Sequence, residues 1–84
     1  MTLYYMFEGR EVNFDIPTNL RVEHLDVLSG LVISYKLLSK DRVTKAAKVQ
    51  EGFIRGYLYG LEMSGITDST INDKLYKFFM EEEE

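Results

Sequence analysis

The sequence predicts a small α+β domain in which an N-terminal β-hairpin precedes three α-helices. Three observations support this fold class. Residues 2–7 are rich in aromatic side chains, and residues 11–16, which follow a turn that contains glycine, alternate polar and apolar side chains. After Pro17, apolar side chains recur every three or four positions, which is the period of a helix. The length of 84 residues is that of one domain, which we expect to cover residues 1–80.

The hairpin is expected over residues 2–16, with its turn at residues 8–10. The first strand is rich in aromatic side chains, and the second ends before Pro17, which cannot donate a hydrogen bond to a ladder. A two-stranded hairpin is not stable alone, so its apolar face should pack against helices. That face of the second strand carries Val12, Phe14 and Ile16.

The first helix is expected over residues 20–39, with Thr18 or Asn19 as its N-cap. The run over residues 31–35 is also compatible with a strand, but the periodicity on either side favours the helix. The spacing predicts one apolar stripe made by Leu25, Leu28, Leu31, Val32, Tyr35 and Leu38.

A second apolar side of this helix carries Val22, Ile33 and Leu37. A helix that is apolar on two sides either lies in the centre of its fold or has a second interface. The sequence leaves both possibilities open, and Ile33 and Leu37 are therefore candidate interface residues.

The second helix is expected over residues 41–64. Its polar face should be formed by Thr44, Lys48, Glu51, Arg55 and Glu62. The centre of its apolar face should be formed by Val43, Ala47, Ile54, Leu58 and Leu61, with Phe53 and Tyr57 beside them.

A row of small residues, spaced by four, is the most informative feature of this second helix. Each glycine inside a helix costs about 0.8–1 kcal/mol relative to alanine, so three glycines need an offsetting interaction. The helical wheel places the row at the border between the apolar and polar faces, where a neighbouring backbone could approach closely. The neighbour could be the helix over residues 20–39 or a second copy of the chain, and a break at Gly52 or Gly60 is the third interpretation. The predicted interface comprises Gly52, Gly56, Gly60 and Ser64, with Tyr59 beside them.

The third helix is expected over residues 68–80. Gly65 should end the preceding helix, and Thr67 should be the N-cap, with Asp68 in the first turn. Residues 81–84 are all glutamate and are expected to form a disordered acidic tail. The apolar side of the helix is predicted to carry Ile71, Leu75, Phe78 and Phe79.

Composition argues against several kinds of chemistry. There is no cysteine and one histidine, His24, so thiolate and histidine-cluster metal sites are excluded, and no phosphate-binding glycine loop is present. We expect neither catalytic residues nor a cofactor. No signal peptide or apolar run of membrane-spanning length is apparent, so a cytoplasmic location is expected. The net charge of −4 equals the charge of the four terminal glutamates, so the rest of the chain is close to neutral.

A basic segment offers a second functional hypothesis, in which the chain binds nucleic acid. Part of it has a passing likeness to the start of a helix-turn-helix, but the helical phase continues through Gly52 where a turn and a recognition helix should follow. The candidate contacts are Lys40, Arg42, Lys45, Lys48 and Arg55.

The sequence therefore predicts a non-enzymatic protein-interaction or regulatory protein that acts as a homodimer and does not enter a membrane. Its protein partner is not identified by any motif, and the alternative is a small DNA-binding regulator. Free hairpin edges are a second place where two copies could pair. In size and style the chain resembles the small, cysteine-free, aromatic-rich proteins common in bacteriophage and prophage genomes, although this likeness covers no diagnostic motif.

Overall fold

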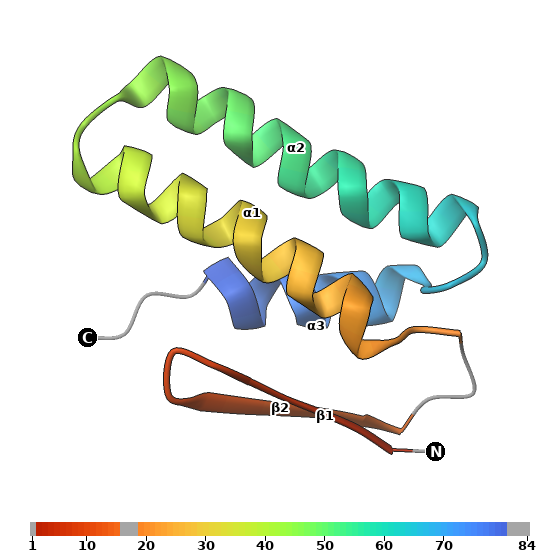
Figure 1. Ribbon diagram of the computed structural model, residues 1–84. Coiled ribbons are helices and arrows are strands. Elements are labelled where there is room, and N and C mark those ends of the chain that lie inside the picture. The colour runs from red at the N-terminus through yellow and green to blue at the C-terminus, as the bar shows by residue number, and fades with distance from the viewer. Residues whose placement is uncertain (1, 16–18, 81–84) are drawn as a thin grey trace.

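The predicted order of elements is confirmed by the computed structural model, which describes residues 2–15 and 19–80. The expectations for Ile16, Pro17, Thr18 and the acidic tail lie outside the described residues. The elements are β1 (Thr2–Phe7), β2 (Arg10–Asp15), α1 (Val22–Lys40), α2 (Thr44–Met63) and α3 (Ser69–Met80). The chain is therefore an antiparallel hairpin followed by three helices (Figure 1).

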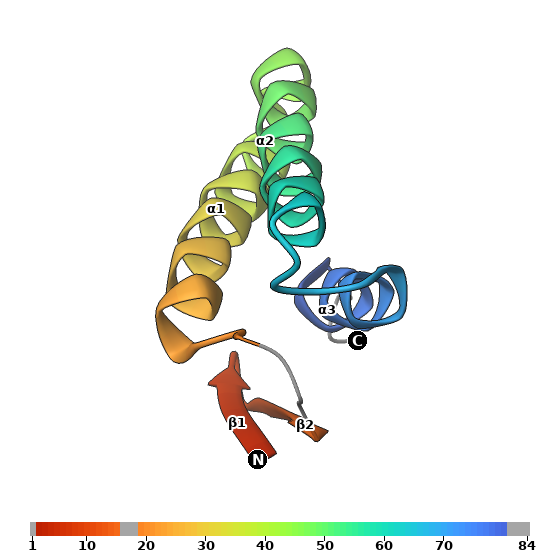
Figure 2. The same ribbon diagram turned by 90° about the vertical axis from the view of Figure 1, so that its right-hand side faces the viewer.

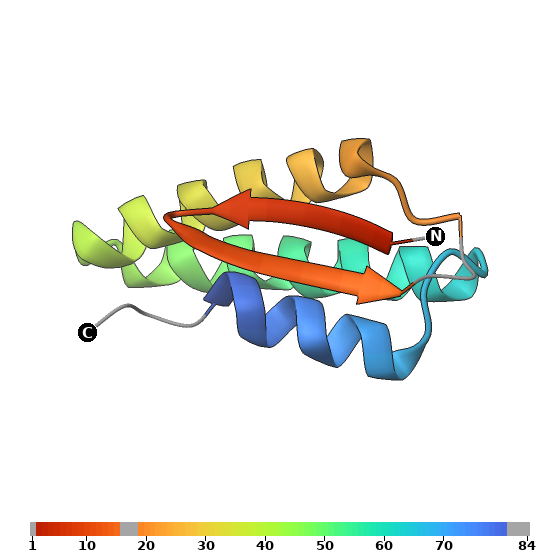
Figure 3. The same ribbon diagram turned by 90° about the horizontal axis from the view of Figure 1, so that it is seen from below.

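The elements form layers, with the hairpin on one side and α2 on the other. Seen from below, the hairpin runs roughly along the helices and covers the space between α1 and α3 (Figure 3). Seen from the end, α2 is the helix farthest from the hairpin (Figure 2). The core fills the space between these layers, and its fully buried side chains come from all three helices: Leu25, Leu28, Val32, Ile54, Leu75 and Phe79.

The hairpin turn is tighter than the sequence predicted. Glu8 and Gly9 both have positive φ angles, +50° and +76°, which is the signature of a two-residue type I′ turn. Arg10 therefore pairs with Phe7 as the first residue of β2 and is not part of the turn. The Nζ atom of Lys36 lies 2.6 Å from the Oε1 atom of Glu8, so an ion pair ties the turn to α1.

The inner face of the hairpin joins it to α3. Phe7 and Val12 are buried there, whereas Tyr4 and Met6 point outward. Arg10 donates a hydrogen bond of 2.6 Å to the main-chain oxygen of Phe78, and the Phe78 carbonyl lies in the last turn of α3. Helix ends leave carbonyls without intrahelical partners, so Arg10 satisfies one of them from a neighbouring element.

The start of α1 differs from the prediction because His24 takes part in the cap. Arg21, not Asn19, is the N-cap residue. The Arg21 N–H donates to Nδ1 of His24 at 3.0 Å, and the His24 N–H donates to the Arg21 carbonyl at 3.1 Å. The only histidine of the chain therefore has a structural role at a helix start.

The end of α1 also differs, because three residues close it before α2 begins at Thr44. Asp41 is the C-cap, and Arg42 follows with a φ of +61°. The N–H of Val43 donates to the carbonyl of Leu38 at 2.9 Å, which completes a Schellman motif. The expectation that α2 starts at residue 41 is therefore wrong, since these residues terminate the preceding helix.

Replacing Arg42 with glycine is expected to raise the free energy of unfolding by about 0.5–1 kcal/mol. A left-handed conformation strains every residue that has a Cβ atom, and glycine is the usual residue at this helix position. Urea denaturation followed by circular dichroism would measure the change. Gly65 holds the equivalent position after α2 with a φ of +75°, so Gly65→Ala should lower the same free energy by about 1 kcal/mol. A loss of stability in Arg42→Gly would contradict this account.

The start of α3 is capped one residue later than predicted. Gly65 ends α2 as expected, with a hydrogen bond of 2.9 Å from the Ile66 N–H to the Leu61 carbonyl. The carboxylate of Asp68, not the Thr67 hydroxyl, accepts the N–H of Ile71 at 2.8 Å, so Asp68 is the N-cap. Thr67 is instead buried, and its hydroxyl donates to the side-chain oxygen of Asn72 at 2.7 Å.

Candidate protein-interaction surface

Helix α2 has two apolar faces on opposite sides. Its inner face packs into the protein through Ala47, Ile54, Leu58 and Leu61. Gly56 lies at the centre of the opposite side of the helix. At about 100° per residue, every residue between 49 and 63 that lies within about 60° of Gly56 on the helical wheel is apolar or glycine. We call this set the outer face: Val49, Gly52, Phe53, Gly56, Tyr59, Gly60 and Met63.

The outer face is open to solvent. Its four large side chains are 57–67% exposed, and its glycines are exposed as well. Single exposed apolar residues are common on protein surfaces, but a continuous stripe along four turns of one helix is typical of a contact surface. The wheel position predicted for Phe53 is therefore wrong, because this ring points away from the core.

The glycine row does not contact another part of the described chain. A Cβ atom built on Gly52, Gly56 or Gly60 would meet nothing within 4 Å. The interpretation that the row packs against α1 of the same chain is therefore wrong. The interpretation as a break is also wrong, because α2 is helical from Thr44 to Met63. The row lies on the side opposite the core and not at its border, so contact between two copies is the remaining interpretation.

The other predicted interface residues lie at different places. Ser64 is the C-cap of α2 and is exposed at the end of the outer face. Ile33 and Leu37 are exposed on α1, which is a separate helix. The prediction missed three members of the outer face: Val49, Phe53 and Met63. Their spacing of three or four residues from the glycines was the signal that could have identified them. Val43, predicted to be in the apolar centre, is 45% exposed because it belongs to the connection before α2.

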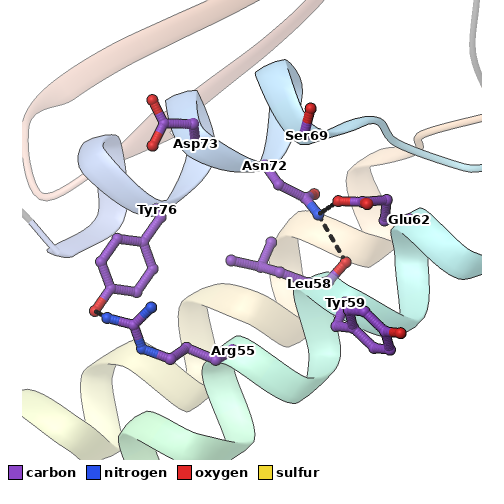
Figure 4. Close-up of a pocket in the computed structure, with 8 residues that line it drawn as sticks. All are labelled: Arg55, Leu58, Tyr59, Glu62, Ser69, Asn72, Asp73 and Tyr76. Carbon is purple, nitrogen blue, oxygen red and sulfur yellow. Dashed lines mark hydrogen bonds between the residues drawn. The ribbon is translucent and has the colours of Figure 1, made fainter.

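Beside the outer face, a pocket of about 270 Å³ lies between α2 and α3 (Figure 4). A chain of polar contacts runs along this groove. The Arg55 guanidinium donates to the Tyr76 hydroxyl at 2.9 Å, and that hydroxyl donates to the Glu51 carboxylate at 3.2 Å. Asn72 donates to the Leu58 carbonyl at 2.9 Å and to the Glu62 carboxylate at 3.2 Å.

These polar groups form hydrogen bonds with one another, and the network therefore connects α2 to α3. The Arg55 guanidinium also lies 4.6 Å from the centre of the Tyr76 ring, a cation–π contact. Burial raises the pKa of the Tyr76 hydroxyl above its ordinary value, and nearby Arg55 acts in the opposite direction. A neutral hydroxyl at physiological pH donates to Glu51, which fits a structural role.

The basic segment is divided by the fold. Lys40, Arg42, Lys45 and Lys48 are exposed around the connection between α1 and α2. Arg55 is directed to Tyr76 and α3 instead. Since α2 runs unbroken through Gly52, residues 44–63 do not contain the turn that a helix-turn-helix requires.

Comparisons with protein families, curated proteins and solved structures found no match for this chain. Across residues 2–15 and 19–80, no three histidine, cysteine, aspartate or glutamate residues are grouped so that they could hold a metal ion. None of the helices in that part of the chain has the length and apolar character needed to cross a bilayer.

Proposed function

We propose that this chain is a non-enzymatic, cytoplasmic protein-interaction or regulatory protein that acts as a homodimer through the outer face of α2. The observation that carries the proposal is the continuous stripe of exposed apolar and small residues between Val49 and Met63. A short chain buries a small fraction of its surface when it folds alone, and association is a common way to bury more.

The glycines support the same conclusion because they lower the stability of the helix in the monomer. Three glycines inside α2 destabilise the monomer by about 2.5–3 kcal/mol relative to alanine, and no intramolecular contact of the described chain offsets this. A partner helix offsets it, because glycine lets two backbones approach closely and places more atoms in contact. A regulatory protein of this type would work by presenting or blocking this surface.

Phe53→Asp is expected to weaken self-association at least about tenfold while leaving the fold intact. A charge at the centre of an apolar contact must lose its water, whereas in the monomer this position is 57% exposed. Analytical ultracentrifugation over a concentration series would measure the association, and circular dichroism would check the fold.

The matched control is Tyr4→Asp, at an aromatic residue that is 62% exposed on the outward side of the hairpin. The hairpin lies on the opposite side of the molecule from α2, so this variant should associate like the wild type (Figure 2). A wild-type chain that stays monomeric at about 100 µM, where weak specific contacts form, would refute the homodimer. Loss of the dimer in Tyr4→Asp alone would move the contact to the hairpin.

DNA binding remains the second candidate from the sequence, with less support. The exposed lysines near the α1–α2 connection could contact phosphate, but Arg55 is directed to Tyr76 and α2 is unbroken. The outer face of α2 is apolar and would not bind the phosphate groups of DNA.

A further inference from the structure

The order of residues on the outer face is symmetric about Gly56. Three positions before and after Gly56 stand the aromatic residues Phe53 and Tyr59. Four positions before and after stand two glycines, and seven positions before and after stand Val49 and Met63. Aromatic, small and aliphatic residues are thus repeated in mirror order along α2, and all of them are exposed.

We infer that two copies of α2 pack antiparallel, with Gly56 of each copy at the two-fold axis. This inference rests on the proposed homodimer and specifies its geometry. A two-fold contact uses the same patch on both copies, so residue i of one copy meets residue j of the other and the reverse. In this register Phe53 meets Tyr59 of the second copy, and Val49 meets Met63.

Shape supports this register. With Gly56 at the axis, the glycines at positions 52 and 60 of the two copies face each other, and the backbones can approach closely. The aromatic rings on either side then fill the space that the missing side chains leave. Offset or edge-to-face contacts between such rings add to the apolar burial.

Charge supports the antiparallel direction. Lys48, Arg55 and Glu62 lie along one flank of the outer face, about 80–120° from Gly56 on the wheel. The antiparallel arrangement brings Lys48 near Glu62 of the second copy at both ends of the contact. A parallel two-fold arrangement would put this flank of the two copies on opposite sides of the seam, so Lys48 and Glu62 of different copies would not meet. Antiparallel helices also align their dipoles favourably.

The available area predicts a dimer that dissociates on dilution. Fully buried aromatic side chains cover about 150–250 Å² each. At their present exposure Phe53 and Tyr59, together with the smaller contributions of Val49 and Met63, offer roughly 400–500 Å² per copy. Two copies would bury roughly 1,000 Å², which is the low end for specific contacts. The test must therefore be made at high protein concentration.

Disulfide trapping can test the register because the chain has no cysteine of its own. Val49→Cys and Met63→Cys are made as separate proteins, both at exposed positions of α2. Residues 49 and 63 are about 21 Å apart along a helix. In the antiparallel register the two copies of residue 49 are therefore about 21 Å apart, as are the two copies of residue 63, and no disulfide spans that distance. Equal amounts are mixed at about 100 µM, oxidised mildly, and the disulfide-linked dimers are identified by mass spectrometry.

The mixed dimer, Val49→Cys joined to Met63→Cys, is expected to exceed either symmetric dimer at least tenfold. A Tyr4→Cys protein, treated alone, reports random collision and should give little dimer. An excess of the symmetric dimers would overturn the antiparallel register while leaving the homodimer in place. Equal yields from all pairs, or more from Tyr4→Cys, would overturn the register because α2 is then not the contact. A wild-type chain that stays monomeric in ultracentrifugation at the same concentration would overturn both proposals.

Discussion

Phe79→Ala is expected to lower the free energy of unfolding by about 3–5 kcal/mol, the largest effect of any single substitution considered. The Phe79 side chain is completely buried. Its ring lies edge-on to the ring of Phe7, with 4.8 Å between their centres, and 5.0 Å from the ring of Phe78. The Tyr5 ring lies 5.9 Å away. Removing the ring leaves a cavity between the hairpin and α3 and breaks the contacts that join them.

Such a loss is large for a chain of this length, since small domains have a total stability of about 5–10 kcal/mol. Urea denaturation followed by circular dichroism would measure it. Met6→Ala is the control, because Met6 is 62% exposed on the outward side of the hairpin, and it should change the stability by less than about 0.5 kcal/mol. If Phe79→Ala and Met6→Ala lost similar amounts, the hairpin would not be held by the aromatic cluster.

The sequence predicted the type and order of the elements because each has a clear period. Alternation placed Val12 on the buried face of the hairpin, and the spacing of Leu25, Leu28 and Val32 placed them in the core. Gly65 was a reliable stop for α2, because glycine has no Cβ atom to oppose a positive φ.

The helix ends were harder to predict because residues with weak preferences occupy the decisive positions. Arg42 adopts a left-handed conformation that sequence rules reserve for glycine or asparagine. His24 accepts the Arg21 N–H at the start of α1, a role that glutamate or glutamine usually fills. Tertiary packing and local hydrogen bonds override the preference at such positions.

The outer face was misassigned for a different reason. A wheel shows which residues share a side, but it does not show which of two apolar sides enters the core. Phe53 was placed beside Ile54 because both are hydrophobic, although only Ile54 is buried. With Phe53 counted in the apolar face, the glycine row fell at the border between the apolar and polar faces of the helix. Only the positions of α1 and α3, which cover one side of α2, show that the row is opposite the core.

The second large effect is expected from replacing Gly52, Gly56 and Gly60 together with alanine. In the monomer this change should raise the free energy of unfolding by about 2–3 kcal/mol, because alanine restricts the unfolded chain more and favours the helix. No steric cost opposes the gain, since a Cβ atom at each position meets nothing within 4 Å. Thermal or urea unfolding of dilute protein would measure it.

The same triple variant is expected to associate at least about tenfold more weakly, because three methyl groups on each copy hold the two backbones apart. Binding to the folded state raises apparent stability, so the melting temperature of the wild type should increase with concentration, whereas that of the variant should not. The effects on monomer and dimer therefore have opposite signs, which a purely structural role of the glycines would not produce.

Gly30→Ala is the matched control. Gly30 lies inside α1, is exposed and has nothing within 4 Å of its Cβ position, so alanine there should add about 0.8–1 kcal/mol to the monomer and leave association unchanged. Unaltered association of the triple variant would mean that the glycines lie outside the contact. A loss of stability in the dilute triple variant would mean that the row makes contacts within the monomer and that the glycines do not destabilise it. Opposite signs in the triple variant, with a simple gain in Gly30→Ala, would tie the glycines of α2 to self-association and not to folding.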